Sequence, residues 1–313
     1  MIIESSRPAL KGQLAYDHPL ARYTSWRVGG PAKIFYAPTD LDDLSHFLAS
    51  LPENEEIVWL GLGSNVLIRD GGIDGVVIMT HPALSKLEQL ENGTVRAEAG
   101  LTCAKLAKFC TRLGLVEGAF FAGIPGTVGG ALAMNAGAFG GETWPHVIGV
   151  ETIDRQGRMR FRHATDFKVG YREVQGLTDE WFVAGHFVFA RSQEDSDLAS
   201  VQAQTKEAIR VLLKKRADTQ PIGTLNCGSV FRNPPGDYAG RLIEACGLKG
   251  MRIGGAEVSP KHCNFIINDG TASAADLEAL IRHVVHAVKL KQGIELILEA
   301  KIIGVQDPYA NHS

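Results

Sequence analysis

Short apolar runs typical of strands and amphipathic segments typical of helices follow one another along this chain without regular alternation. Residues 22–80 predict strands around one short helix at 41–48. Residues 85–190 predict a helix near 102–113, then a glycine-rich segment and several strands. The strands predicted in these two stretches include 57–60, 66–68, 75–78, 147–153 and 182–189.

A polar helix over roughly residues 195–215 separates these stretches from a last one at about 220–304. This last stretch predicts strands and two helices, one at 240–246 and one that begins near Ser273. The order lacks the repeated strand–helix–strand rhythm of a doubly wound sheet. The pattern therefore predicts an α+β fold.

Composition narrows the class of protein. With 313 residues, of which 45% are hydrophobic and 21% charged, the chain is long enough for about two domains of an ordinary globular protein. The net charge of −3 gives no reason to expect binding to nucleic acid or a membrane. Five cysteines without a C-x-x-C pair indicate reduced thiols and no metal site. Without a signal-peptide pattern or a membrane-spanning apolar run, we expect a cytoplasmic protein, and a monomer.

Residues 123–142, GIPGTVGGALAMNAGAFGGE, form the most informative segment. Seven of these twenty residues are glycine, and a segment so poor in side chains cannot build a core. Glycine lets backbone N–H groups approach a ligand closely, because it has no Cβ and tolerates φ above zero. Phosphate oxygens most often require that approach. The segment predicts a cofactor cradle; a glycine-rich surface loop or tight packing of elements is the alternative.

A second glycine loop, GLGSN at 61–65, follows the strand predicted at 57–60. It begins like the dinucleotide fingerprint G-x-G-x-x-G, but Val66 replaces the third glycine and an extended segment follows instead of a helix. A Rossmann unit requires a strand, a tight turn and a helix, so any pyrophosphate here would lie on loop amides. Together with a small-residue segment at 26–32, the two loops predict a large diphosphate cofactor.

Polar residues in two further segments are candidates for chemistry. Ser229 is a candidate proton donor, although a serine that only bonds local backbone groups would have the same sequence context. Its neighbour Cys227 is a rival as a nucleophile. Arg172 could hold a carboxylate in bidentate fashion or simply pair with Glu173.

Near the C-terminus, residues 294–301 predict an apolar strand in which Glu295 and Glu299 share one face. Two carboxylates on such a strand suggest that one is buried for a purpose, although an edge strand facing water would show the same pattern. His283 and His286 lie off the apolar side of the last helix and have no third ligand nearby, so we interpret them as solvated side chains.

In this order, the segments closely resemble the UDP-N-acetylenolpyruvoylglucosamine reductase family over about residues 23–304. The motifs that carry the resemblance are GLGSN (61–65), GIPGTVGG (123–130), MNAGA (134–138), GYRE (170–173), NCGSVFRNP (226–234), KHCNFIIN (261–268) and the closing strand with Glu299.

The resemblance implies an FAD-binding fold of the vanillyl-alcohol-oxidase (PCMH) type in two subdomains, followed by an α+β substrate-binding domain. The boundaries expected from it are 1–82 and 83–195 for the FAD-binding subdomains, 196–219 for a bridging helix, 220–304 for the substrate domain and 305–313 for a tail.

The resemblance also implies the chemistry. NADPH reduces a non-covalently bound FAD, which passes hydride to the vinyl C3 of UDP-N-acetylglucosamine-enolpyruvate; protonation at C2 then gives UDP-N-acetylmuramate, a peptidoglycan precursor. Ser229 matches the family's proton donor, and Arg172 and Glu299 match the pair that polarises the substrate carboxylate. The residues that match the FAD cradle are Gly61, Gly63, Ser64, Asn65, Gly123, Gly126, Thr127, Gly129, Gly130, Asn135 and Gly137. The residues that match substrate contacts are Tyr171, Asn233 and His262, and no metal is implied.

The chain departs from the usual family pattern in two places. Glu173 and Val174 follow Arg172, where the family usually has a serine two residues on. Only about ten residues separate Arg172 from the strand predicted at 182, which leaves no room for the tyrosine-bearing loop of the longer subtype. The chain therefore resembles the shorter subtype.

Four other functions compete with this reading. They are an NAD-dependent dehydrogenase of Rossmann type, a transferase that uses Cys227 or Ser229, another FAD-dependent oxidoreductase of the same fold, and a non-catalytic nucleotide-binding module. The missing third glycine disfavours the first, and the long glycine segment disfavours the second. A flavin spectrum of the purified protein would separate the flavoenzymes from the others.

Overall fold

The computed structural model describes residues 10–191 and 197–307. Residues 1–9, 192–196 and 308–313, which include most of the expected tail, lie outside the described residues. The chain divides into two compact units, and each combines stretches from separate parts of the sequence. Unit 1 comprises residues 1–15, 35–61 and 77–212, and unit 2 comprises residues 16–34, 62–76 and 213–313.

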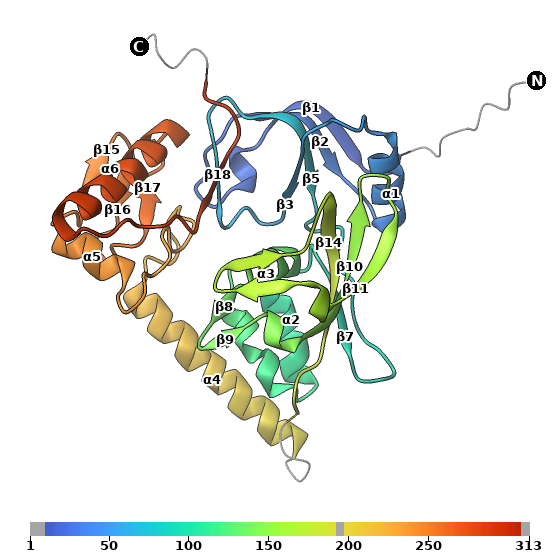
Figure 1. The fold of residues 1–313 in the computed structure, drawn as a ribbon. Coiled ribbons are helices and arrows are strands. Elements are labelled where there is room, and N and C mark those ends of the chain that lie inside the picture. Colours follow the sequence, from blue (N-terminus) through green and yellow to red (C-terminus); the bar gives the residue numbers. More distant parts are fainter. Residues whose placement is uncertain (1–9, 192–196, 308–313) are drawn as a thin grey trace, which may run out of the picture. The chain divides into compact units, whose positions relative to one another are not determined.

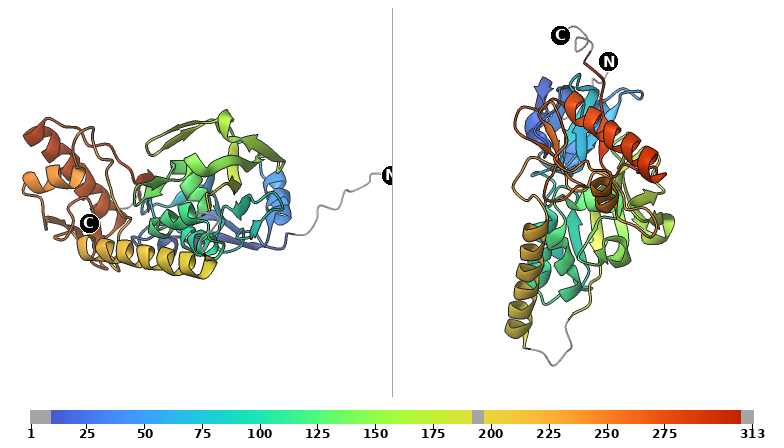
Figure 2. Two further views of the ribbon diagram at one scale, coloured as in Figure 1. Left: turned by 90° about the horizontal axis from the view of Figure 1, so that it is seen from below. Right: turned by 90° about the vertical axis from the view of Figure 1, so that its left-hand side faces the viewer.

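The chain passes from one unit to the other five times, once in the loop after Gly61 and four times within secondary-structure elements. Three of these are β1 (Gln13–Pro19), β2 (Pro31–Ala37) and β5 (Ile73–Met79), which form a four-stranded sheet with β3 (Ile57–Leu60) in the order β1–β2–β5–β3 (Figure 1). The fourth is α4 (Leu198–Thr219), one continuous helix (Figure 2).

Unit 1 is built mainly on a second sheet of five strands. The remaining elements of this unit are α1 (Leu41–Ser50), β6 (Leu87–Gln89), β7 (Val95–Glu98), α2 (Cys103–Arg112), α3 (Val128–Met134), β8 (Gly137–Ala138), β9 (Gly141–Glu142), β10 (Val147–Asp154), β11 (Met159–His163), β12 (Lys168–Gly170), β13 (Glu173–Gln175) and β14 (Glu180–Phe187). The sheet has the order β11–β10–β14–β7–β6, and every neighbouring pair is antiparallel.

One face of this sheet is covered by α3, which packs against β14 and β7. The apolar side chains of α2 and α3 join aromatic residues in one buried cluster that includes Phe121, Trp144 and Phe187. The indole N–H of Trp144 donates to the carbonyl oxygen of Leu132 in α3 at 2.8 Å, so the polar atom of this buried ring is satisfied. This packing fixes α3 on the sheet.

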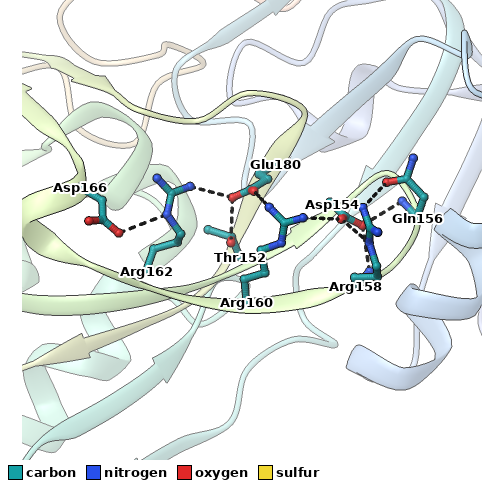
Figure 3. Close-up of polar contacts among 8 residues, drawn as sticks. All are labelled: Thr152, Asp154, Gln156, Arg158, Arg160, Arg162, Asp166 and Glu180. Carbon is teal, nitrogen blue, oxygen red and sulfur yellow. Dashed lines mark hydrogen bonds and ion pairs between the residues drawn. The ribbon is translucent and has the colours of Figure 1, made fainter.

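The edge of the sheet at β11 carries a row of arginines and carboxylates (Figure 3). The buried carboxylate of Glu180 accepts hydrogen bonds from Arg160 at 2.7 Å and Arg162 at 3.0 Å, and from the hydroxyl of Thr152 at 3.1 Å. Asp154 likewise accepts from Arg158 at 2.8 Å. These charge-assisted bonds join β10, β11 and β14 side by side.

Unit 2 has a smaller sheet covered by one long helix. The elements of this unit are β4 (Val66–Ile68), α5 (Ala239–Ala245), β15 (Arg252–Ile253), β16 (Ala256–Val258), β17 (Ile266–Asn268), α6 (Ala274–Gln292) and β18 (Lys301–Ile303). The strands β15, β16 and β17 form an antiparallel sheet against which α6 packs, and β18 pairs with β4 in parallel (Figure 1).

Early segments of the sequence complete the core of unit 2. Trp26, Val28 and Leu67 are buried in the same cluster as the apolar face of α6. The N-terminus of α6 is capped by Ser273, and the carboxylate of Asp70 accepts from two further N–H groups of its first turn, each at 2.9 Å. The fold of residues 213–307 is therefore held by residues far away in the sequence.

The helices expected from the sequence are confirmed, but one expected strand is wrong. The helices expected at 41–48, near 102–113, at roughly 195–215, at 240–246 and from Ser273 appear as α1, α2, α4, α5 and α6. Residues 294–301 do not form a regular strand; the part before β18 is irregular apart from one bridge between Leu298 and Phe231. In the described part of the chain, no helix is long and apolar enough to cross a bilayer.

Candidate active site

In unit 1, the start of the first glycine loop lies next to the second glycine segment. A Cβ built on Gly61, at the start of the first loop, would lie 2.5 Å from the hydroxyl oxygen of Thr127 in the second. Thr127 in turn bridges to Thr102, and these two threonines are the N-caps of α3 and α2. The beginnings of two helices and the start of the first loop are thus brought to one place.

The glycines of residues 123–142 serve two different purposes. Gly123 and Gly129 are required by packing, because an added Cβ would lie 2.6 Å from Ala138 and 2.9 Å from Ala99. Gly130, in the first turn of α3, is exposed, and the nearest atom to its added Cβ would be 3.8 Å away. The N–H groups of this turn already donate within the chain, so Gly130 offers open space for a phosphate group rather than free donors.

Part of this segment contributes to the core, against the expectation that it could not. Val128, Ala131 and Leu132 of α3 are buried in the main cluster of unit 1. The reason is that the second and third of these residues lie three and four positions after the first and share its side of the helix, while Gly130 and Ala133 lie exposed on the other side. Some small residues of this segment therefore serve packing and others leave room for a ligand, so the cofactor cradle and the tight packing of elements are compatible interpretations.

Arg172 lies at the tip of a two-residue hairpin loop in unit 1. Gly170 of β12 pairs with Glu173 of β13, so Tyr171 and Arg172 form the turn between these strands. The guanidinium carbon of Arg172 lies 5.6 Å from the centre of the Tyr171 ring, within the range of a cation–π contact. Tyr171 itself is exposed.

Asn135, expected to touch the cofactor, is buried beneath this hairpin. Its amide nitrogen donates to the carbonyl oxygen of Gly170 at 3.2 Å and to the carboxylate of Glu142 at 3.0 Å. Its amide oxygen accepts from the backbone N–H of Trp144 at 3.0 Å. The side chain therefore connects the end of α3 to the base of the Arg172 hairpin.

In unit 2, the segment that carries Ser229 is held from both sides. The backbone of Glu299 donates to the carbonyl oxygen of Val230 at 2.8 Å, and that of Arg232 donates to Ile297 at 2.8 Å. On the other side the buried side chain of Asn264 bonds both the N–H and the carbonyl of Phe231, at 3.0 and 2.9 Å. Ser229 thus directly precedes a rigid stretch, and the Glu299 segment lies beside it.

The two C-terminal glutamates have different surroundings. Glu295 is exposed and forms an ion pair with Lys289 at 2.7 Å. Glu299 is half-buried, and its carbonyl oxygen accepts from the side chain of Asn65 at 2.9 Å. Asn65, expected as a cofactor residue of the first loop, thus binds the backbone of Glu299.

The thiol of Cys227 is suppressed rather than activated. Burial, with a smaller contribution from the negative charge of Glu299, raises the pKa of Cys227 far above its usual value. A thiol that stays protonated is a poor nucleophile, which argues against Cys227 as a catalytic thiol. All five cysteines are free and buried.

Asn233 and His262, the expected substrate contacts, both lie at the start of α5. The side-chain oxygen of Asn233 accepts from the backbone N–H of Ala239 at 3.1 Å. His262 packs against Phe265, with ring centres 4.8 Å apart, and burial lowers its pKa. A neutral imidazole has one donor and one acceptor nitrogen, so His262 can form hydrogen bonds with uncharged groups.

The glycines of the small-residue segment at 26–32, and Gly63 of the first glycine loop, are explained by packing alone. A Cβ added to Gly29 would lie 2.8 Å from the side chain of Ile68. A Cβ added to Gly30 would lie 2.1 Å from the carbonyl oxygen of Asp70. A Cβ added to Gly63 would lie 2.0 Å from the carbonyl oxygen of Tyr23. These glycines allow close backbone approach within unit 2. Among residues 10–191 and 197–307, no group of three His, Cys, Asp or Glu side chains could hold a metal ion.

Comparison with known proteins decides the family. A domain described as "FAD binding domain" matches residues 32–161, and one described as "UDP-N-acetylenolpyruvoylglucosamine reductase, C-terminal domain" matches residues 220–303. The UDP-N-acetylenolpyruvoylglucosamine reductase of Coxiella burnetii is 58% identical over 94% of this chain and 97% of its own length. The chain belongs to the UDP-N-acetylenolpyruvoylglucosamine reductase family.

Two further relatives of this reductase family agree. The enzyme of Legionella pneumophila is 54% identical over 94% of this chain and 95% of its own length. The crystal structure of UDP-N-acetylenolpyruvylglucosamine reductase from Thermus caldophilus matches with a TM-score of 0.76 at 28% identity, over 95% of this chain and all of that one. The expected α+β architecture, with an FAD-binding fold of the vanillyl-alcohol-oxidase type, is confirmed.

The sequence analysis missed one residue that shapes the site of this reductase. Asn264 lies within the motif KHCNFIIN, which was noted only for its resemblance. An asparagine inside a run of buried apolar residues must find hydrogen-bond partners, and this signal could have identified it as a support. Its partner, the Phe231 backbone, could not be inferred, because it lies 33 positions away in the sequence.

Proposed function

We infer that this protein is the NADPH-dependent flavoenzyme that reduces the enolpyruvyl ether of UDP-N-acetylglucosamine-enolpyruvate to UDP-N-acetylmuramate in peptidoglycan precursor synthesis. The observation that carries this proposal is the pairing of the Ser229 segment with the Glu299 segment in unit 2. This backbone pairing connects the segment of Ser229, whose hydroxyl matches the family's proton donor, with the segment of Glu299, whose carboxylate matches one of the family's electrostatic groups. A cytoplasmic, monomeric enzyme follows from the same proposal.

When bound, FAD would supply the hydride chemistry between NADPH and C3 of the substrate. The open space beside Gly130, in the first turn of α3, is the part of this chain that we assign to its diphosphate. The binding is non-covalent. Ser64 and Gly126 keep the assignment to FAD that the resemblance implies, whereas Thr127 caps α3.

The residues of this chain act on the enolpyruvyl group in defined roles. The guanidinium of Arg172 binds the substrate carboxylate and stabilises the negative charge that develops on it when hydride reaches C3, and Glu299 acts with Arg172 in polarising this carboxylate. The hydroxyl of Ser229 then gives its proton to C2, and the resulting alkoxide regains a proton from water. Tyr171, Asn233 and His262 contact the rest of the UDP-sugar.

Stopped-flow measurement of Ser229→Ala tests this function. The variant should be yellow and should reduce its flavin with NADPH at nearly the wild-type rate. Reoxidation by UDP-N-acetylglucosamine-enolpyruvate should slow by about 10²–10⁴-fold, the usual contribution of one general acid. An equal loss in both half-reactions would contradict the role of Ser229, and a wild-type protein without flavin would contradict the function itself.

A further inference from the structure

The backbone at Asn135 suits glycine as well as asparagine. Asn135 ends α3 in the left-handed conformation, with φ 44° and ψ 52°, and its N–H closes the helix on the carbonyl oxygen of Ala131. Glycine is the usual residue at such a helix end, and asparagine is the second choice. The cap alone therefore does not explain the asparagine, so its side chain needs a reason of its own.

The amide nitrogen of Asn135 donates two hydrogen bonds, and its amide oxygen accepts one. The side chain is 3% exposed, and it donates to Gly170 and Glu142 while it accepts from Trp144. A buried amide with three partners on three different segments holds those segments in fixed relation. The segments are β9, the start of the short 3-10 helix Trp144–His146 that follows it, and the end of β12.

The end of β12 is the base of the Arg172 turn. Gly170, whose carbonyl oxygen Asn135 binds, is two residues before Arg172. The turn has φ +57° at Arg172, its second central residue, as in a type II turn, where glycine or asparagine is usual. An arginine kept in this strained conformation indicates that its guanidinium is needed at this point.

We propose that Asn135 is a positioning residue for the reduction step: it holds the β12–β13 hairpin against the end of α3 so that Arg172 is presented to the substrate carboxylate. This rests on the proposed function. It replaces the expectation that Asn135 contacts FAD, because the three contacts above occupy its amide. Anchoring the hairpin restricts the positions of the Arg172 guanidinium, and bidentate binding of a planar carboxylate requires such a fixed position.

Asn135→Gly tests the proposal, since glycine keeps the helix cap and removes only the side chain. We expect flavin content close to wild type and flavin reduction by NADPH within about threefold. Reoxidation by substrate should slow by about 10–100-fold, the scale of a misplaced catalytic group. The dissociation constant of the substrate from the oxidised protein, measured by titration of the flavin absorbance, should rise by about the factor lost with one charge-assisted hydrogen bond, roughly tenfold.

Two further variants separate positioning from general damage. Asn135→Asp keeps the acceptor for Trp144 but loses both donors, so it should slow reoxidation at least as much as the glycine variant. Asp179→Gly is the matched control, because Asp179 is also left-handed (φ 50°) and its carboxylate also pairs within unit 1, with Arg155 at 2.9 Å. It should leave both half-reactions and the dissociation constant unchanged.

A double-mutant cycle shows whether Asn135 acts through Arg172. In an Arg172→Ala background, Asn135→Gly should slow reoxidation by less than about twofold further, because the group that it positions is gone. An equal slowing in both backgrounds, a loss of flavin, or equal loss in both half-reactions would overturn the proposal. An active wild type with an unaffected Asn135→Gly variant would overturn it while leaving the proposed function intact; a wild type that does not reduce the substrate would overturn both.

Discussion

Glu295 and Glu299 are four positions apart, yet only Glu299 is joined by its backbone to the Ser229 segment. Glu295 lies in water with Lys289 as its partner. Periodicity could not separate the two, because a regular strand would have put both on one face. The irregular backbone before β18 separates them in the structure.

From this difference we predict that Glu299→Gln slows reoxidation of the reduced flavin by substrate by at least ~10²-fold, the effect of losing one preorganised electrostatic group. Glu295→Gln is the matched control and should change the rate little, since an exposed ion pair contributes little to the surrounding fold. Stopped-flow reoxidation traces measure both. A slow Glu295 variant beside a normal Glu299 variant would show that the wrong carboxylate has been assigned.

At the residue scale, the sequence identified candidate types better than it identified partners. Ser229, Arg172 and Glu299 were reached through their motifs, but the motifs did not reveal that the side chains of Asn135 and Asn65, expected on the cofactor, bond Gly170 and Glu299. A side-chain amide in a glycine-rich loop has the same sequence signature whether it binds a ligand or a distant strand. Only the folded chain distinguishes the two.

At the scale of elements, α3 combines buried and open positions one residue apart. Gly129 faces Ala99, and Gly130 is open. We predict that Gly130→Val gives folded, colourless protein, because the side chain fits the chain itself but fills the space proposed for the diphosphate. Gly129→Val should instead lower the melting temperature, since its side chain meets Ala99. Absorbance near 450 nm and circular dichroism measure the two effects, and a yellow Gly130→Val protein would remove α3 from the cofactor site.

The β10–β11–β14 edge gives a second prediction at this scale. Glu180→Gln should lower the free energy of unfolding by about 1–3 kcal/mol, because the buried group then faces two guanidinium groups with one acceptor oxygen and no charge. Glu207→Gln, which breaks the exposed pair of Glu207 with Arg210, is the control and should have no measurable effect. Chemical denaturation measures both, and equal effects would show that burial does not matter here.

Helices were easier to expect than strands. The caps Thr102 and Ser273 and the apolar face of α6 are local signals, and the corresponding helices begin where these signals lie. The failed strand at 294–301 depended on a partner, and the available partner is the short Ser229–Arg232 segment, which bonds it irregularly. Strand assignment needs pairing information that a single segment does not contain.

At the scale of the whole molecule, unit 2 depends on segments from both ends of the chain. We predict that a fragment of residues 213–313 does not fold alone, because it lacks Trp26, Val28 and Leu67 from its core and Asp70 from the start of α6. Its far-ultraviolet circular dichroism and proton NMR dispersion should be those of an unfolded chain, while the full chain serves as the control. A dispersed spectrum from the fragment would show that residues 213–313 form a self-sufficient core.

The domain organisation could be predicted only as consecutive ranges. The boundaries expected at 82, 195 and 219 stay a prediction. Composition and the order of motifs indicate where one type of sequence gives way to another. They do not reveal that residues 16–34 and 62–76 belong with residues 213–313. Such long-range association is set by which apolar surfaces meet, and a single sequence carries no direct record of it.

The placement of Trp26 also has a consequence for synthesis in the cell. A ribosome makes residue 26 long before it makes α6, so this large aromatic side chain lacks most of its native partners for most of the time that translation takes. It can be buried fully only after α6 has been made. A chain that stops before α6 would leave the indole exposed to chaperones and proteases.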